Sequence, residues 1–98
     1  MIDKLKEIIA HFESLELKMA DPNVVNDQKL YTESAREHRR LSPIVEKSHQ
    51  FIKITNQIDD DINILNSDDK DLKEIAKAEI EDLQISLKNL EKELKVLL

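Results

Sequence analysis

The apolar residues of the first twenty positions recur at steps of three and four, which is the spacing of one face of an α-helix. They are Ile2, Leu5, Ile9, Phe12, Leu15 and Met19. The segment 20–23, Ala-Asp-Pro-Asn, ends this pattern. The residue before a proline is disfavoured in the α region, and Asp and Asn favour turns. The pattern therefore predicts a helix over about residues 2–20.

A second pattern follows Asn26, a good N-cap residue, with Asp27 placed where a helix N-terminus favours negative charge. Its first part carries one face at Leu30, Ser34, His38, Leu41 and Val45. Pro43 interrupts this course, because proline lacks an N–H group and clashes with the carbonyl four residues back. We expect a helix over about residues 27–66 with a kink or a break at 42–43.

Two seams of near-heptad spacing occupy the rest of the chain. The first contains Ile44, Ser48, Phe51, Thr55, Ile58, Ile62 and Leu65. A polar turn follows, in which Ser67 or an aspartate should cap a helix over about residues 70–97. The second seam contains Leu72, Ala76, Ile80, Leu83, Leu87, Leu90, Leu94 and Leu97. Two seams joined by a short turn predict an antiparallel, coiled-coil-like hairpin.

These patterns predict an all-α fold, an elongated bundle of three main helices in a single domain over residues 1–98. The second helix is expected to be kinked near Pro43 and to form the long hairpin with the third. The helical pattern continues to Leu97 and Leu98 without a C-cap or a polar tail. We therefore expect the chain to be a piece of a longer protein.

The composition excludes several classes of function, because the 98 residues include no glycine, no cysteine and no tryptophan. Without glycine there is no phosphate-binding loop or dinucleotide fingerprint. Without cysteine there is no thiol nucleophile, disulfide or zinc-thiolate site. No run of about 18 apolar residues and no signal-peptide pattern is present. The expectation is a soluble, cytoplasmic protein with no membrane partner.

The histidines do not form a recognisable metal or catalytic motif. No two of them stand at the i, i+4 spacing that lets two imidazoles share a zinc ion on one helix. The three are His11, His38 and His49. His38 lies on the apolar stripe, so a packed or half-buried ring is expected there. We predict no catalytic residue, no metal, no cofactor and no small-molecule substrate.

Residues 59–63, Asp-Asp-Asp-Ile-Asn, contain the D-x-D-x-N opening of a calcium-binding loop. Ile64 and Lys70 stand where that loop requires Gly and Glu, and Ile62 belongs to the helical seam. We therefore interpret these aspartates as a solvated helix face.

The net charge of −6 is unevenly distributed. Residues 29–53 carry six basic residues against three glutamates, whereas residues 54–71 carry six aspartates against one lysine. In the basic segment Arg36, Arg39 and Arg40 stand at i, i+3 and i+4, with Lys29 seven residues before Arg36 and Lys47 seven after Arg40. Guanidinium groups suit phosphate and carboxylate partners. Two interpretations remain open: a solvated face balanced by Glu33 and Glu37, or a stripe that binds an RNA backbone or an acidic protein surface.

Two stretches, residues 19–28 (Met-Ala-Asp-Pro-Asn-Val-Val-Asn-Asp-Gln) and 41–47 (Leu-Ser-Pro-Ile-Val-Glu-Lys), carry a family resemblance. They resemble the N-terminal domain of bacterial peptide chain release factor 1, a class-1 release factor. The resemblance continues through 74–80 and 94–98 and covers essentially the whole chain. Release factor 2 typically carries a Phe-Trp pair where this chain has Val24 and Val25, so release factor 1, which reads UAA and UAG, is favoured.

The resemblance implies a protein that enters the ribosome at a stop codon and triggers hydrolysis of peptidyl-tRNA. The family cleaves the ester with a Gly-Gly-Gln loop and reads the codon with a Pro-x-Thr motif. Neither occurs here, so no catalytic residue is carried over and this fragment is not expected to be an enzyme. The implied role of the domain is accessory.

The implied partners are the ribosome, through its stalk-base protein and rRNA backbone, and the release-factor GTPase. Arg36, Arg39 and Arg40, with Lys29 and Lys47, are the candidate contact residues. The competing hypothesis is a free-standing coiled-coil or helical-bundle adaptor. Such a fragment would self-associate through an exposed leucine-rich face formed by Leu87, Leu90, Leu94 and Leu97.

Overall fold

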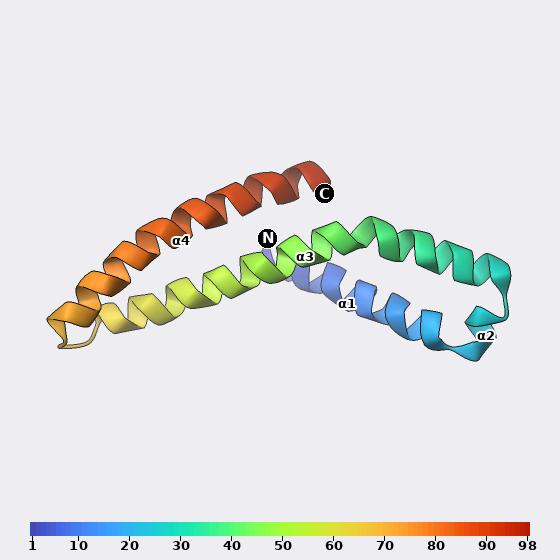
Figure 1. Ribbon diagram of the computed structural model, residues 1–98, viewed down its shortest axis with the longest axis horizontal. Helices are drawn as coiled ribbons and strands as arrows, with labels where there is room; N and C mark the ends of the chain where they lie inside the picture. The colour runs from blue at the N-terminus through green and yellow to red at the C-terminus, as the bar shows by residue number, and fades with distance from the viewer. The chain divides into compact units, whose positions relative to one another are not determined.

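A computed structural model describes all 98 residues, and every regular element in it is a helix. The elements are α1 Ile2–Ala20, α2 Pro22–Val25, α3 Gln28–Leu65 and α4 Lys70–Leu97 (Figure 1). The prediction of an all-α fold is confirmed, and α2 is a short helix that the periodicity did not indicate. The chain divides into two compact units, residues 1–48 and 49–98, which are described one at a time.

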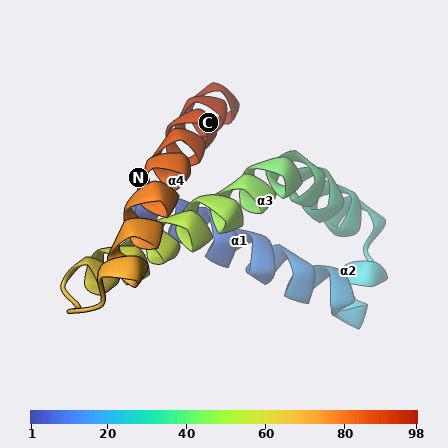
Figure 2. The same cartoon turned by 60° about the vertical axis from the view of Figure 1, so that its left-hand side comes forward.

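In the first unit, α1 lies beside the first part of α3, and α2 joins the two (Figure 2). The buried apolar side chains of this unit are Leu5, Leu15, Leu41, Ile44 and Val45. Ser48 is also fully buried, and its hydroxyl donates a hydrogen bond of 2.6 Å to the carbonyl of Ile44. The polar group is therefore satisfied where it is out of reach of water.

Side-chain caps define the connection between α1 and α3. The Asp21 carboxylate accepts a hydrogen bond of 2.9 Å from the Asn23 amide, and Pro22 starts α2, where its missing N–H group has no partner to lose. Asp27 accepts from the Leu30 amide at 3.2 Å and caps α3. The prediction of Asn26 as this cap was wrong, because Asn26 ends α2 in a helical conformation.

α3 continues through Pro43 as one helix, so of the two predicted alternatives at 42–43, a kink or a break, the break does not occur. Proline lacks the N–H group that would donate to the carbonyl of Arg39. Ile44 and Val45 directly after it are almost fully buried. Their burial offsets the lost hydrogen bond, since tertiary packing routinely overrides local helix propensity.

In the second unit, the remainder of α3 and α4 form the predicted antiparallel hairpin, joined by a turn at 66–69 (Figure 1). Its buried apolar side chains are Phe51, Ala76, Leu90 and Leu94. The expectation of an exposed leucine face on α4 was wrong for two of its members, because Leu90 and Leu94 are only 9% and 0% exposed. Leu87 is half-buried, and Leu97 remains exposed.

Asp69 is the N-cap of α4, in agreement with the prediction that either Ser67 or an aspartate caps this helix. Its carboxylate accepts hydrogen bonds from the amides of Asp71 at 3.0 Å and Leu72 at 3.1 Å. These are two of the first amides of the helix, which have no partner within it. The cap therefore holds the first turn of α4 in place and sets where the hairpin turns back.

Replacing Asp69 by alanine should lower the free energy of unfolding by about 1 kcal/mol, because both amides lose their acceptor. Urea unfolding followed by far-UV circular dichroism measures this difference. Asp68→Ala removes a neighbouring carboxylate that caps nothing and should leave stability within about 0.5 kcal/mol of the parent. Equal losses in the two variants would contradict the capping role.

Candidate partner-binding surface

A stripe of basic residues runs along the exposed side of α3 in the first unit. Lys29 and Arg36 are seven residues apart, which places them within about 20° of each other around the helix axis. Arg40 follows one turn later on the same side. His38, Leu41 and Val45, which are buried or half-buried, lie on the opposite side of the helix. The stripe therefore faces away from the packing surface with α1.

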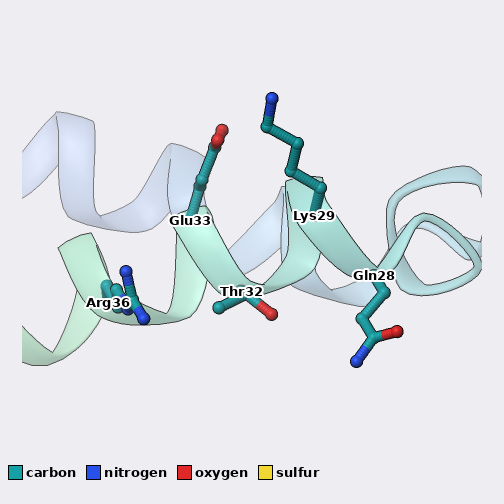
Figure 3. Close-up of a pocket in the computed structure, with 5 residues that line it drawn as sticks. All are labelled: Gln28, Lys29, Thr32, Glu33 and Arg36. Atoms are coloured by element: carbon teal, nitrogen blue, oxygen red, sulfur yellow. The ribbon is translucent and has the colours of Figure 1, made fainter.

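Lys29 and Arg36 line a shallow hollow of about 460 Å³ together with Gln28, Thr32 and Glu33 (Figure 3). All five come from consecutive turns of α3. Lys29 and Glu33 extend to one side of the helix and Gln28 to the other, with Thr32 between them. Two cations, a hydroxyl and an amide share this open surface with the carboxylate of Glu33, so the groups that can donate to an anion outnumber the single anionic side chain.

Arg40 differs from the other two cations because it is already paired. Its Nη2 atom lies 2.6 Å from Oε1 of Glu37, and its Nε atom donates to Oε2 of the same carboxylate at 3.0 Å. This bidentate hydrogen bond lowers the pKa of Glu37 and raises the pKa of Arg40. Arg40 is exposed and Glu37 is only partly buried, so the pair adds little to stability. The ion pair with Glu37 does, however, neutralise the charge that Arg40 contributes to the stripe.

The remaining candidate residues lie at the margin of the hollow. Arg39 is exposed and is rotated by roughly 60° from Arg36 around the axis of α3. Lys47 is half-buried near the end of the first unit. No ion pair holds Lys29, Arg36 or Arg39. The structure thus groups two of the five predicted residues around one hollow and leaves the other three outside it.

Two reciprocal histidine–glutamate contacts join α1 to α3 beneath the stripe. Nε2 of His11 lies 3.8 Å from Oε1 of Glu37, and Nε2 of His38 lies 3.4 Å from Oε2 of Glu16. The His38 ring also stacks on Phe12, with 4.2 Å between ring centroids. The expected half-buried position of His38 is confirmed. These partly exposed contacts accompany the buried apolar side chains that hold α1 and α3 together.

Sequence reasoning missed a second charged feature, a pair of carboxyl groups in the second unit. Asp61, on α3, was interpreted as part of a solvated face but is only 7% exposed. It shares a hydrogen bond with Glu79 of α4, which raises the pKa of Glu79 above its ordinary value of 4.5. The position of Asp61 three residues after Ile58 on the seam is the signal that could have placed it near the interface.

The chain shows no arrangement suited to metal binding. No group of three or more histidine, aspartate or glutamate side chains is placed to hold a metal ion, and there is no cysteine. None of the helices is long and apolar enough to cross a membrane. The fold and the exposed charges together define an all-helical chain with a basic face on α3.

The chain belongs to the PCRF domain family, whose model matches residues 8–98. Peptide chain release factor 1 of Syntrophus aciditrophicus is 41% identical over 98 residues, all of this chain and 28% of that protein. The protein of the same name from Lactobacillus gasseri is 38% identical over 96 residues, 97% of this chain and 26% of that protein. That from Lawsonia intracellularis is 37% identical over 98 residues, with 27% of its length covered.

The chain therefore spans about a quarter of the length of the curated relatives it matches. No solved structure matches it. The resemblance carried by the segments around Pro22 and Pro43 is confirmed at the level of the family, and the coverage extends through both compact units.

Glu79→Gln should raise the melting temperature at pH 7 and change it little at pH 4. The folded state raises the pKa of Glu79, so protonation of this carboxyl stabilises the fold. That stabilisation is complete below about pH 4.5 and is lost as the pH rises through the raised pKa. Glutamine imitates the protonated carboxyl at every pH. Thermal unfolding from pH 4 to 7 measures the effect.

The matched control is Glu81→Gln, which removes an exposed carboxylate from the same helix. Its effect on the melting temperature should not grow with pH in this way. A difference between Glu79→Gln and the parent that stays constant from pH 4 to 7 would show that the carboxyl pair does not titrate as described.

Proposed function

We propose that this chain is the N-terminal domain of a bacterial class-1 release factor that directs peptide release at UAA and UAG codons in the cytoplasm. The observation that carries the proposal is the match of the whole chain to proteins named peptide chain release factor 1 at 34–41% identity. Val24 and Val25, where release factor 2 typically carries Phe-Trp, support the assignment to release factor 1.

In this proposal the domain has no catalytic role. The family cleaves peptidyl-tRNA with a Gly-Gly-Gln loop, and the chain has no glycine from which such a loop could be built. The domain instead contributes binding energy to a factor whose chemistry lies in its other parts.

The surface we assign to ribosome binding is the basic stripe of α3, centred on Lys29 and Arg36. These two cations share one hollow with the hydroxyl of Thr32, the amide of Gln28 and the carboxylate of Glu33. Phosphate oxygens of an rRNA backbone, or carboxylates of an acidic protein, match this donor set. Because Glu37 neutralises Arg40, we place the centre of the contact closer to the start of α3 than the sequence suggested.

The location proposed for the contact is the ribosomal stalk base, through its protein and rRNA backbone. The domain would then influence the release-factor GTPase that recycles the complex. The stripe lies in residues 29–53, which carry six basic residues against three glutamates in an acidic chain, and it is on the exposed side of a helix. Long-range attraction to a polyanion therefore acts through this segment.

The double variant Lys29→Glu/Arg36→Glu, in a release factor carrying this domain, should weaken ribosome binding by about tenfold or more at low salt. The loss should shrink as salt rises, because added salt screens the contacts that the parent makes. Binding to ribosomes with UAA in the A site, measured by fluorescence at several salt concentrations, checks this. Lys88→Glu/Lys92→Glu on α4 makes the same charge change away from the stripe and should weaken binding much less. Unchanged affinity at low salt in the first variant would refute the proposed contact.

The codon assignment has its own test. A release factor carrying this domain should release peptide from ribosomes programmed with UAA or UAG, and release at UGA should be slower by orders of magnitude. Rates of peptide release on the three codons under single-turnover conditions decide between release factors 1 and 2. Efficient release at UGA with none at UAG would overturn the assignment while leaving the family unchanged.

A further inference from the structure

The basic stripe is interrupted by a carboxylate between its two central cations. Glu33 stands four residues after Lys29 and three before Arg36, and all three side chains are exposed and line the same hollow (Figure 3). These spacings place Glu33 within about 60° of both cations around the helix axis. A partner that approaches this side of α3 therefore meets a positive, a negative and a positive charge along roughly 10 Å of the helix.

The negative charge of Glu33 is not neutralised within the chain. Side chains three or four residues apart can form ion pairs along a helix. None joins Glu33 to Lys29 or Arg36, in contrast to the ion pair between Glu37 and Arg40. Figure 3 shows the side chains of Glu33 and Lys29 extended away from the helix on the same side. All three charges are therefore available to a partner.

A carboxylate at this position opposes an RNA contact. The phosphates of an RNA backbone are all negative, so a strand that bound both Lys29 and Arg36 would also bring negative charge close to Glu33. Like charges placed against each other weaken an interface and exclude the wrong partner. A protein surface can instead place a lysine or arginine between two carboxylates. Such a surface is complementary to all three side chains.

An exposed apolar side chain borders the same part of the stripe. Leu30 precedes Glu33 by three residues, so the two are neighbours on the surface of α3, and Leu30 is 46% exposed. A phosphate backbone has little apolar surface with which to cover a leucine, whereas a protein partner can bury it. Leu30 therefore favours the same class of partner as Glu33.

We infer that Glu33 is a specificity-determining residue of the basic stripe, and that the stripe binds a protein surface in which a basic residue lies between two acidic ones. Lys29 and Arg36 each lie against a carboxylate of the partner, and Glu33 lies against the basic residue between them. An apolar side chain of the partner covers Leu30. The inference rests on the ribosome contact proposed above and selects a protein over the rRNA backbone as its partner.

The sign of the effect of Glu33 on ribosome binding tests this inference. In a release factor carrying this domain, Glu33→Gln should weaken binding to ribosomes with UAA in the A site by about two- to fivefold, the range of one exposed ion pair. Glu33→Lys should weaken it further, because it places like charges against each other. Fluorescence titration at low salt measures both affinities. An RNA backbone would give the opposite sign, since each variant removes a repulsion.

Glu46 provides the matched control, because it is exposed on α3 outside the hollow and its substitution makes the same change of charge. Glu46→Gln and Glu46→Lys should leave the affinity unchanged or slightly raised, since they add only to the general attraction between the factor and the ribosome. Leu30→Ala should weaken binding by about threefold. Leu72→Ala on α4, at 47% exposure against 46%, should change it little. Melting temperatures show whether each variant keeps the fold.

Failure of the inference is distinguishable from failure of the proposed contact. Tighter binding of the Glu33 variants would make the rRNA backbone the partner and overturn the inference, while the stripe would remain the ribosome contact. Equal affinities of the Glu33 and Glu46 variants would place Glu33 outside the contact and would also overturn the inference. Unchanged affinity of Lys29→Glu/Arg36→Glu at low salt would refute the contact itself, and the inference would fail with it.

Discussion

The apolar seam of α3 is the interaction on which the rest of the structure depends. This one helix supplies the packing surface for α1 in the first unit and for α4 in the second. Ile44 and Val45 keep it helical directly after Pro43, because their burial outweighs the hydrogen bond that proline removes. Since a helix in a two-helix pairing buries only one stripe, the opposite side of α3 stays in water. The charged surfaces follow from that constraint.

The two units handle their charged residues in opposite ways. In the first, Glu37 accepts a bidentate hydrogen bond from Arg40 and also approaches His11 on α1, so its charge is shared by two cationic or polar neighbours. In the second, Asp61 is buried against Glu79, and one of its oxygens has no partner. The first arrangement lowers the pKa of a carboxyl and the second raises one. The carboxylate of Glu37 thus has its hydrogen bonds satisfied within the first unit. The Asp61–Glu79 pair keeps an unsatisfied oxygen, which is costly in a buried position.

Much of the fold could be predicted from residue spacing, because steps of three and four identify the buried side of each helix directly. Leu5, Leu15, Leu41, Phe51, Ala76 and Leu94 all lie on predicted faces and are all buried. The misses have physical causes. α2 is only four residues long and contains no full period, and Asn26 lost the capping position because it completes that short helix. The leucine pattern could not show which of its members would be covered, since spacing defines a face but not what packs on it.

The candidate site was predictable only in part for the same reason. The spacing of Lys29, Arg36 and Arg40 predicts that they lie on one side of α3, but the pairing of Arg40 with Glu37 depends on side-chain conformation. The carboxyl pair depends on the register between α3 and α4, which brings Asp61 to Glu79 across 17 intervening residues. Register is a property of two packed helices together, so no single-helix pattern contains it.

The chain has no glycine, the residue with the greatest backbone freedom, and its charged surfaces are correspondingly ordered before binding. These charged surfaces are built on helices, and the turns that join them are held by the carboxylates of Asp21, Asp27 and Asp69. Side chains on a helix lose less conformational freedom on binding than side chains on a mobile loop, because their backbone is already ordered. Each surface therefore presents its charges in a fixed spacing before any partner arrives. Its selectivity then rests on the match between that spacing and the charges of the partner, rather than on a rearrangement of the chain.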